Sequence, residues 1–203
     1  IFVAGSAIQW LRDKLFFFKD AKHTEILYSE ANKSENVVIV PALTGLGAPH
    51  WNPNARGAIF GLTRNTAIPE IVKATLDSLV FQTFDLINIM EKDSNIKIKG
   101  IYVDGGMADN NKFIQSLSDI LQIEIIKPNN VEASVLGAAY LAYINSNSQK
   151  NNNELAINID KYNVKDSISF FPKIDKSSTN SKLMKWKKAC LLYTSPSPRD
   201  RVL

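Results

Sequence analysis

The segment IYVDGGMADNN, residues 101–111, places a short apolar run, a pair of glycines and a helix-start pattern in direct succession. An apolar run is typical of a buried strand, and paired glycines let the backbone turn sharply and approach a ligand closely. The N–H groups that a helix leaves unpaired at its N-terminus point toward such a ligand. We therefore expect a strand over residues 100–104, a turn at Gly105 and Gly106, and a helix over residues 109–121.

This turn lacks the two familiar phosphate-binding patterns. The chain has no G-x-G-x-x-G fingerprint, and no Lys-Ser/Thr pair follows the glycines as it would in a P-loop. Taken alone, the glycine pair fits a ligand contact and an ordinary tight connection equally well.

Outside this segment, the spacing of apolar residues predicts further strands and helices. The longest helix is expected over residues 67–92, where apolar residues recur at steps of three and four, Thr66 is a suitable N-cap and Pro69 falls in the first turn. The other expected elements are strands at residues 36–43, 58–62 and 123–127, and helices at residues 6–14 and 131–144. The alternation indicates an α/β layer architecture.

The composition is that of a globular protein. Of 203 residues, 45% are hydrophobic and 22% charged, which excludes a disordered chain, a collagen-like chain and a disulfide scaffold. No apolar run reaches the ~18 residues of a membrane span, and a signal-peptide pattern is absent. Lysines are scattered among acidic residues and the net charge is only +4, so we expect no nucleic-acid partner. The single Cys indicates a reducing compartment, and we expect a cytoplasmic location.

Both ends of the chain look unlike natural termini. Residue 1 is Ile, and the chain opens directly on an apolar segment, so we expect coding sequence upstream of it. Near the other end, CLLYTSPSPRD, residues 190–200, resembles one translated frame of a transposase adapter used to build sequencing libraries. We therefore expect one domain over residues 1–189 and an artefactual tail over residues 190–203, disordered from residue 196 onward and without effect on stability.

Two segments resemble a known fold. The Asp-Gly-Gly turn resembles the adenosine-contacting element of the sugar kinase, actin and heat-shock-protein ATPases, and EASVLGAAYLA, residues 132–142, resembles their inter-lobe connecting helix. Gly137 in that helix would allow the close helix crossing that a hinge requires. The resemblance implies an α/β, ribonuclease H-like or actin-like ATPase fold, with this chain as the C-terminal lobe of a two-lobed sugar kinase.

A longer resemblance indicates the family. GAIFGL from Gly57, seven further residues and EIVKATLD ending at Asp77 match the second signature of the FGGY carbohydrate kinases. TGLGAPHWNPNARGAIFGLTR, residues 44–64, and AGSAIQWLRD, residues 4–13, are similar to the glycerol kinase branch of that family. Pentulose kinases usually carry Glu-Arg-x-Pro where this chain has Leu-Gly-Ala-Pro, residues 46–49.

The resemblance implies a nucleotide site but no catalytic residue. In glycerol kinases the residues matching Gly5, Gln9, Gly106 and Asn110 contact ATP, and Mg²⁺ accompanies it. The catalytic carboxylate, the glycerol contacts and the phosphate loops belong to segments upstream of Ile1, and no metal ligand can be assigned. The implied reaction is ATP-dependent phosphorylation of glycerol to glycerol 3-phosphate by a full-length homo-oligomer, in which the isolated chain is inactive.

Two other functions remain open: another FGGY sugar or polyol kinase, such as a pentulose kinase, and a non-catalytic actin-like module. A structural role is expected for Asp104 at the end of its strand, whereas Asp77 has no assigned role. Further conspicuous side chains are expected on the surface or in loops (His23, His50) or in packing (Trp10, Trp51, Phe16, Phe17, Phe18).

Overall fold

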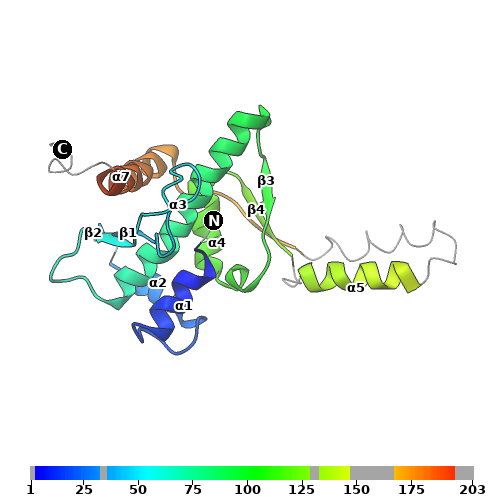
Figure 1. The fold of residues 1–203 in the computed structure, drawn as a ribbon, viewed down its shortest axis with the longest axis horizontal. Helices are drawn as coiled ribbons and strands as arrows, with labels where there is room; N and C mark the ends of the chain where they lie inside the picture. The colour runs from blue at the N-terminus through cyan, green and yellow to red at the C-terminus, as the bar shows by residue number, and fades with distance from the viewer. Residues whose placement is uncertain (1–2, 33–35, 129–132, 147–166, 195–203) are drawn as a thin grey trace.

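The computed structural model describes residues 3–32, 36–128, 133–146 and 167–194 (Figure 1). Its helices are α1 (Gly5–Asp13), α2 (His23–Glu30), α3 (Ile68–Ser94), the 3-10 helix η1 (Gly106–Asp109), α4 (Asn111–Leu121), α5 (Ala133–Ser146) and α7 (Lys176–Thr194). Its strands are β1 (Val38–Val40), β2 (Ala58–Phe60), β3 (Gly100–Tyr102), β4 (Glu124–Lys127) and β5 (Ile168–Phe170). The expected mixture of helices and strands is confirmed.

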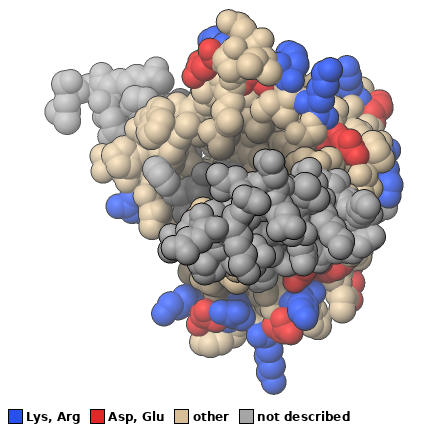
Figure 2. Space-filling model, turned by 90° about the vertical axis from the view of Figure 1, so that its right-hand side faces the viewer, with Lys and Arg blue, Asp and Glu red and all other residues tan. Residues whose placement is uncertain are grey.

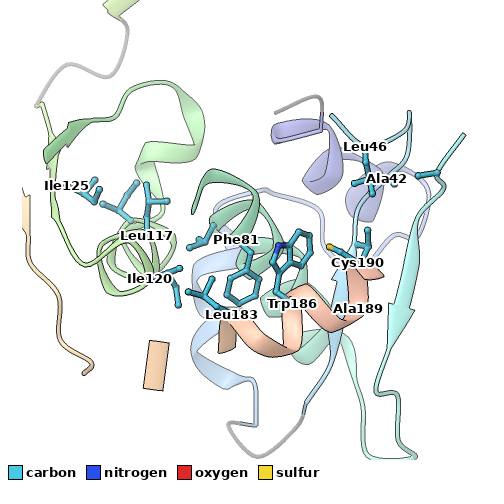
Figure 3. Close-up of a cluster of buried hydrophobic side chains, with 14 of the residues drawn as sticks. Ala42, Leu46, Phe81, Leu117, Ile120, Ile125, Leu183, Trp186, Ala189 and Cys190 are labelled. Carbon is cyan, nitrogen blue, oxygen red and sulfur yellow. The ribbon is translucent and has the colours of Figure 1, made fainter. Parts of the chain in front are cut away.

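The long helix α3 is the centre of the fold, and α1, α2, α4, α7 and β1 pack around it (Figure 1). Residues 70–81 of this helix are buried, apart from the partly buried Lys73, so burial extends beyond the single apolar stripe that the sequence indicated. Two buried clusters meet along it. One contains Leu11 of α1, and the other contains Phe81 and Trp186 and is drawn in Figure 3.

Two small sheets flank α3. β1 pairs with β2 in antiparallel register, with Ile39 opposite Ile59. β3 pairs with β4 in parallel, with Ile101 opposite Ile125, and β5 joins the other edge of β4 in antiparallel register, with Phe170 opposite Ile125. A parallel pair needs a crossover, which η1 and α4 provide between β3 and β4. The glycine turn therefore lies where the chain leaves the sheet.

The expectation that Thr66 caps α3 is wrong. The cap position is Ala67, whose backbone N–H donates to the Glu70 carboxylate at 2.8 Å, while Pro69 lies in the first turn as expected. Thr66 instead closes the preceding turn, where its hydroxyl oxygen accepts from the N–H of Thr63 at 2.9 Å. Since alanine has no side-chain acceptor, the helix begins with the carboxylate half of a capping box only.

The packing expectation is wrong for two aromatic residues. Trp51 and Phe16 are 72% and 80% exposed, whereas Phe18 is buried and Phe17 and Trp10 pack against the core. Phe16 has a φ of 56° in the left-handed turn that ends α1, and the N–H of Phe17 donates to the carbonyl of a residue in the last turn of that helix.

The C-terminal helix extends further than the sequence suggested. α7 continues through the expected boundary at residues 189–190 and ends at Thr194, and Cys190 is only 1% exposed in the same cluster as Trp186. The Cys190 side chain thus fills part of the core, whereas the artefactual origin expected for residues 190–203 stays a prediction. Residues 196–203, where disorder was expected, lie outside the described residues.

The surface is mixed in charge. In the view of Figure 2, lysine and arginine side chains alternate with aspartate and glutamate around the edge of the molecule. Within the described part of the chain, no helix combines the length and apolar character needed to cross a bilayer. Helix α5 extends away from the rest of the fold (Figure 1), and an added β carbon at Gly137 would meet nothing within 4 Å. The hinge role expected for this helix stays a prediction.

Candidate functional site

A cavity of about 500 Å³ opens where α1, the start of α2 and the glycine turn meet. Its lining comes from Ile8 of α1, from five of residues 20–25, and from four of residues 106–110. This volume is typical of a small-molecule site. Of the four nucleotide-contacting residues expected from the sequence, the structure brings Gly106 and Asn110 together on its wall.

The two glycines of the turn differ in their physical requirement. Gly105 has φ 80° and ψ 174°, a conformation that essentially only glycine adopts without strain. Gly106 has no positive φ, and a β carbon added to it would meet nothing within 4 Å. Gly105 therefore shapes the turn, whereas Gly106 leaves space on the wall of the cavity.

Asn110 connects two walls of the cavity. Its Oδ1 accepts a hydrogen bond from the N–H of Phe113 at 2.9 Å and so caps α4. Its Nδ2 donates to the hydroxyl oxygen of Thr24 in α2 at 3.1 Å. A primary amide has two N–H groups and two oxygen lone pairs, so one of each remains after these bonds.

The other expected pair lies beside the cavity and not on its lining. Gly5 begins α1, and Gln9 lies one turn later with an exposed side chain. Ile8, next to Gln9, does line the cavity. Whether a nucleotide reaches Gly5 and Gln9 stays a prediction.

The segment that sequence reasoning missed is residues 20–25. It supplies the charged groups Asp20, Lys22 and Glu25, which with Asp109 give three carboxylates against one ammonium group around the cavity. Asp20 accepts from the N–H of Lys22 at 2.9 Å just before α2 begins. An aspartate followed closely by a helix was the available signal for this turn.

Asp77, which had no assigned role, holds α2 against α3 and α4. Its Oδ1 accepts from the Tyr28 hydroxyl at 2.8 Å and from the Ser116 hydroxyl at 3.2 Å, and its other oxygen pairs with Lys73. Burial, together with the negative charge of Asp77, raises the pKa of Tyr28, so the phenol stays protonated and donating. Asp77, the last residue of the FGGY-like signature, thus fixes the position of α2, and the start of α2 forms one wall of the cavity.

The remaining conspicuous side chains lie outside the cavity lining. His23 is exposed, as expected, and His50 is half-buried, with an Nε2 atom that is buried and has no partner among the described residues. Asp104 is exposed, and its structural role stays a prediction. Among the described residues, no group of three or more His, Cys, Asp or Glu side chains is placed to hold a metal ion.

Comparison with known proteins relates this chain to a kinase family. The C-terminal domain of the FGGY family of carbohydrate kinases matches residues 1–146. The chain is 42% identical over 189 residues to a glycerol kinase of Alkaliphilus metalliredigens, covering 93% of this chain and 37% of that protein. It is 52% identical over 142 residues to a glycerol kinase of Pediococcus pentosaceus, covering 70% and 28% respectively.

Solved structures give the same picture of the fold. Plasmodium falciparum glycerol kinase with ADP superposes with a TM-score of 0.82 and 29% identity, covering 95% of this chain and 37% of that one. A xylulose kinase from Rhodospirillum rubrum superposes with a TM-score of 0.69 at 18% identity, over 94% and 38%. The actin-like lobe expected from the sequence is confirmed, and the chain spans between 28% and 38% of the length of these relatives.

Proposed function

Because the chain belongs to the FGGY family of carbohydrate kinases, we propose that it forms the nucleotide-binding lobe of an ATP-dependent glycerol kinase. The observation that carries this proposal is the cavity at the glycine turn, where Gly106 leaves open space and Asn110 presents an amide. The similar P. falciparum glycerol kinase was solved with ADP, which supports a nucleotide as the ligand.

The charges around the cavity favour the adenosine end of the nucleotide. Three carboxylates against one ammonium group disfavour a polyphosphate, whereas carboxylates accept readily from ribose hydroxyls and an exocyclic amine. The phosphates would then extend away from this wall, toward the lobe encoded upstream. Phosphoryl transfer depends mainly on positioning and charge neutralisation, so this chain contributes by holding one end of ATP.

Glycerol is the acceptor that the identities favour. The matches at 42% and 52% identity are glycerol kinases, whereas the xylulose kinase likeness, at 18%, supports the fold alone. We place the general base, the glycerol contacts, the phosphate loops and Mg²⁺ binding with the upstream lobe, and no step is assigned to a residue of this chain. The complete enzyme is proposed to be a cytoplasmic homo-oligomer.

The nucleotide proposal is tested by titrating ADP into the ¹⁵N-labelled 203-residue chain. Saturable shifts should map to the amides of Gly106, Met107 and Asn110, and adenosine should produce the same pattern. A folded chain with no shifts, or with shifts confined to other surfaces, would contradict the proposal.

The proposal that glycerol is the acceptor predicts that one of two proteins is active and the other is not. The 203-residue chain alone should form no glycerol 3-phosphate, whereas the chain joined to an upstream lobe should phosphorylate glycerol faster than xylulose or gluconate. The measurement is product formation from ATP with each acceptor, in a preparation free of host kinase. Product from the isolated chain, or preference for a pentulose, would contradict it.

A further inference from the structure

We infer that Thr24 is a positioning residue that holds the side-chain amide of Asn110 in one orientation for the nucleotide, an inference that rests on the proposed function. The two residues are 86 positions apart in the sequence, and they join α2 to the start of α4 across the cavity wall. Among the described residues, no other side chain accepts a hydrogen bond from the Asn110 Nδ2 atom.

The direction of each hydrogen bond follows from the neighbours. The Thr24 hydroxyl donates its only hydrogen to the carbonyl of Ala21 at 2.6 Å. It can therefore only accept from Asn110, which requires the amide nitrogen to face α2. The N–H of Phe113 requires an acceptor, so the amide oxygen must face α4. Together the two bonds exclude the flipped amide.

Burial makes this orientation persistent. Thr24 is only 3% exposed, so water does not readily replace its hydroxyl as the acceptor. Helix α2 is itself held by the Tyr28 hydroxyl bond to Asp77 in α3. The amide of Asn110 thus presents one fixed N–H and one fixed lone pair to the cavity, and a ligand need not spend binding energy on ordering it.

The test is a double-mutant cycle on ADP binding by the 203-residue chain. Thr24→Val removes the hydroxyl at nearly constant shape and should weaken ADP binding about three- to tenfold, the value of one hydrogen bond. Thr24→Ser should restore binding. In an Asn110→Ser background, which keeps an N-cap acceptor, Thr24→Val should have no further effect.

The outcomes separate this role from others. An equal loss in both backgrounds would mean that Thr24 contacts the ligand or supports the fold directly, and no loss in either would mean that it has no role; both overturn the inference. If Thr24→Val does not fold, hydrogen exchange of the Asn110 side chain in the unaltered protein decides, because one Nδ2 proton should exchange more slowly than the other. Equal exchange of the two protons overturns the inference.

A separate control addresses the proposed function. Gly106→Val should reduce ADP binding regardless of what Thr24 does, because it fills open space in the cavity. If Gly106→Val weakens binding and the cycle shows no coupling, only the role of Thr24 fails. If the unaltered chain binds no ADP, the nucleotide site itself fails, and the positioning role with it.

Discussion

Gly105 and Gly106 are adjacent and chemically identical, yet the structure uses them for different reasons. Gly105 adopts a backbone conformation closed to other residues, whereas Gly106 has an ordinary conformation beside an open cavity. Position 105 requires glycine for its backbone conformation, whereas position 106 requires glycine because a larger side chain would occupy space that a ligand needs. Substitutions should therefore separate folding from binding between two neighbouring residues.

In the chain completed with an upstream kinase lobe, Gly106→Val should raise the KM for ATP about 30- to 150-fold, equivalent to ~2–3 kcal/mol of lost binding. The glycerol KM should hardly change, because no glycerol contact is assigned to this lobe. The matched control is Gly105→Ala, which should lower the free energy of unfolding by ~1–3 kcal/mol. A folded Gly106→Val enzyme with normal ATP KM and raised glycerol KM would refute the assignment.

Local pattern could predict the glycine turn but not its partners. The strand, Gly105, Gly106 and Asn110 lie within one short segment, so their proximity follows from chain connectivity. The bond between Asn110 and Thr24 joins residues 86 positions apart, and the bond between Tyr28 and Asp77 spans 49. No periodicity in the sequence encodes such pairs, because they depend on how α2 docks.

At the level of the element, Glu70 determines how α3 begins. Its carboxylate accepts from the N–H of Ala67 at 2.8 Å and from the N–H of Asn32 at 2.8 Å, so it ties the start of α3 to the segment after α2. Burial alone would raise the pKa of Glu70, but hydrogen bonds from the backbone N–H groups of Asn32, Ala67 and Glu70 itself outweigh it and hold the pKa below its ordinary value. The charged form is therefore the one that the folded state prefers.

Glu70→Gln should lower the free energy of unfolding by ~1–2 kcal/mol at pH 7, because an amide offers only one oxygen to two N–H donors. A lowered folded pKa means that the stabilisation is full above the unfolded value of about 4.3 and is lost as pH falls through the folded value. Urea unfolding of both proteins between pH 7 and about pH 3 measures this, because the loss occurs only below the unfolded pKa.

The difference in the free energy of unfolding between Glu70→Gln and the unaltered protein should stay nearly constant down to about pH 4.3 and shrink as the pH falls below it. A pH-independent difference would show that the charge of Glu70 is not what α3 requires. Lys73→Gln, on the same helix and away from the cap, is the control. Its effect on the free energy of unfolding should come from loss of the ion pair with Asp77 and not from the start of the helix.

Elements with strong local signals could be predicted, and elements fixed by distant contacts could not. The apolar repeat of α3 identified 25 of its 27 residues in advance, residues 68–92, and placed its end within two positions. Helix α2 has only eight residues, and β5 has three that pair with β4 some forty residues earlier in the chain. Such short elements carry too little pattern to be recognised alone.

On the scale of the whole molecule, α7 completes the larger core. Trp186 is 1% exposed, stacks on Phe81 with ring centroids 5.6 Å apart, and donates its Nε1 hydrogen to Asp85 at 2.7 Å. Burial and the charge of Asp85 raise the pKa of Cys190 to about 12, so this thiol acts as a small apolar side chain in the core. Helix α7 is therefore held against α3 by buried contacts.

Two truncations test how much of that helix the fold needs. A chain ending at Thr194 keeps every described residue of α7, whereas a chain ending at Ala189 loses the buried Cys190 and the last turn. Removal of one small core side chain and the adjoining turn should cost ~1–3 kcal/mol, which lowers Tm by about 2–4 °C per kcal/mol for a domain of this size. Thermal unfolding followed by circular dichroism should thus give a lower Tm for the shorter chain only. Cys190→Ala in the full chain separates side-chain burial from helix length, and should account for part of the loss. Equal Tm values for the two truncations would mean that residues 190–194 contribute nothing to stability, as the sequence alone had suggested for the whole tail.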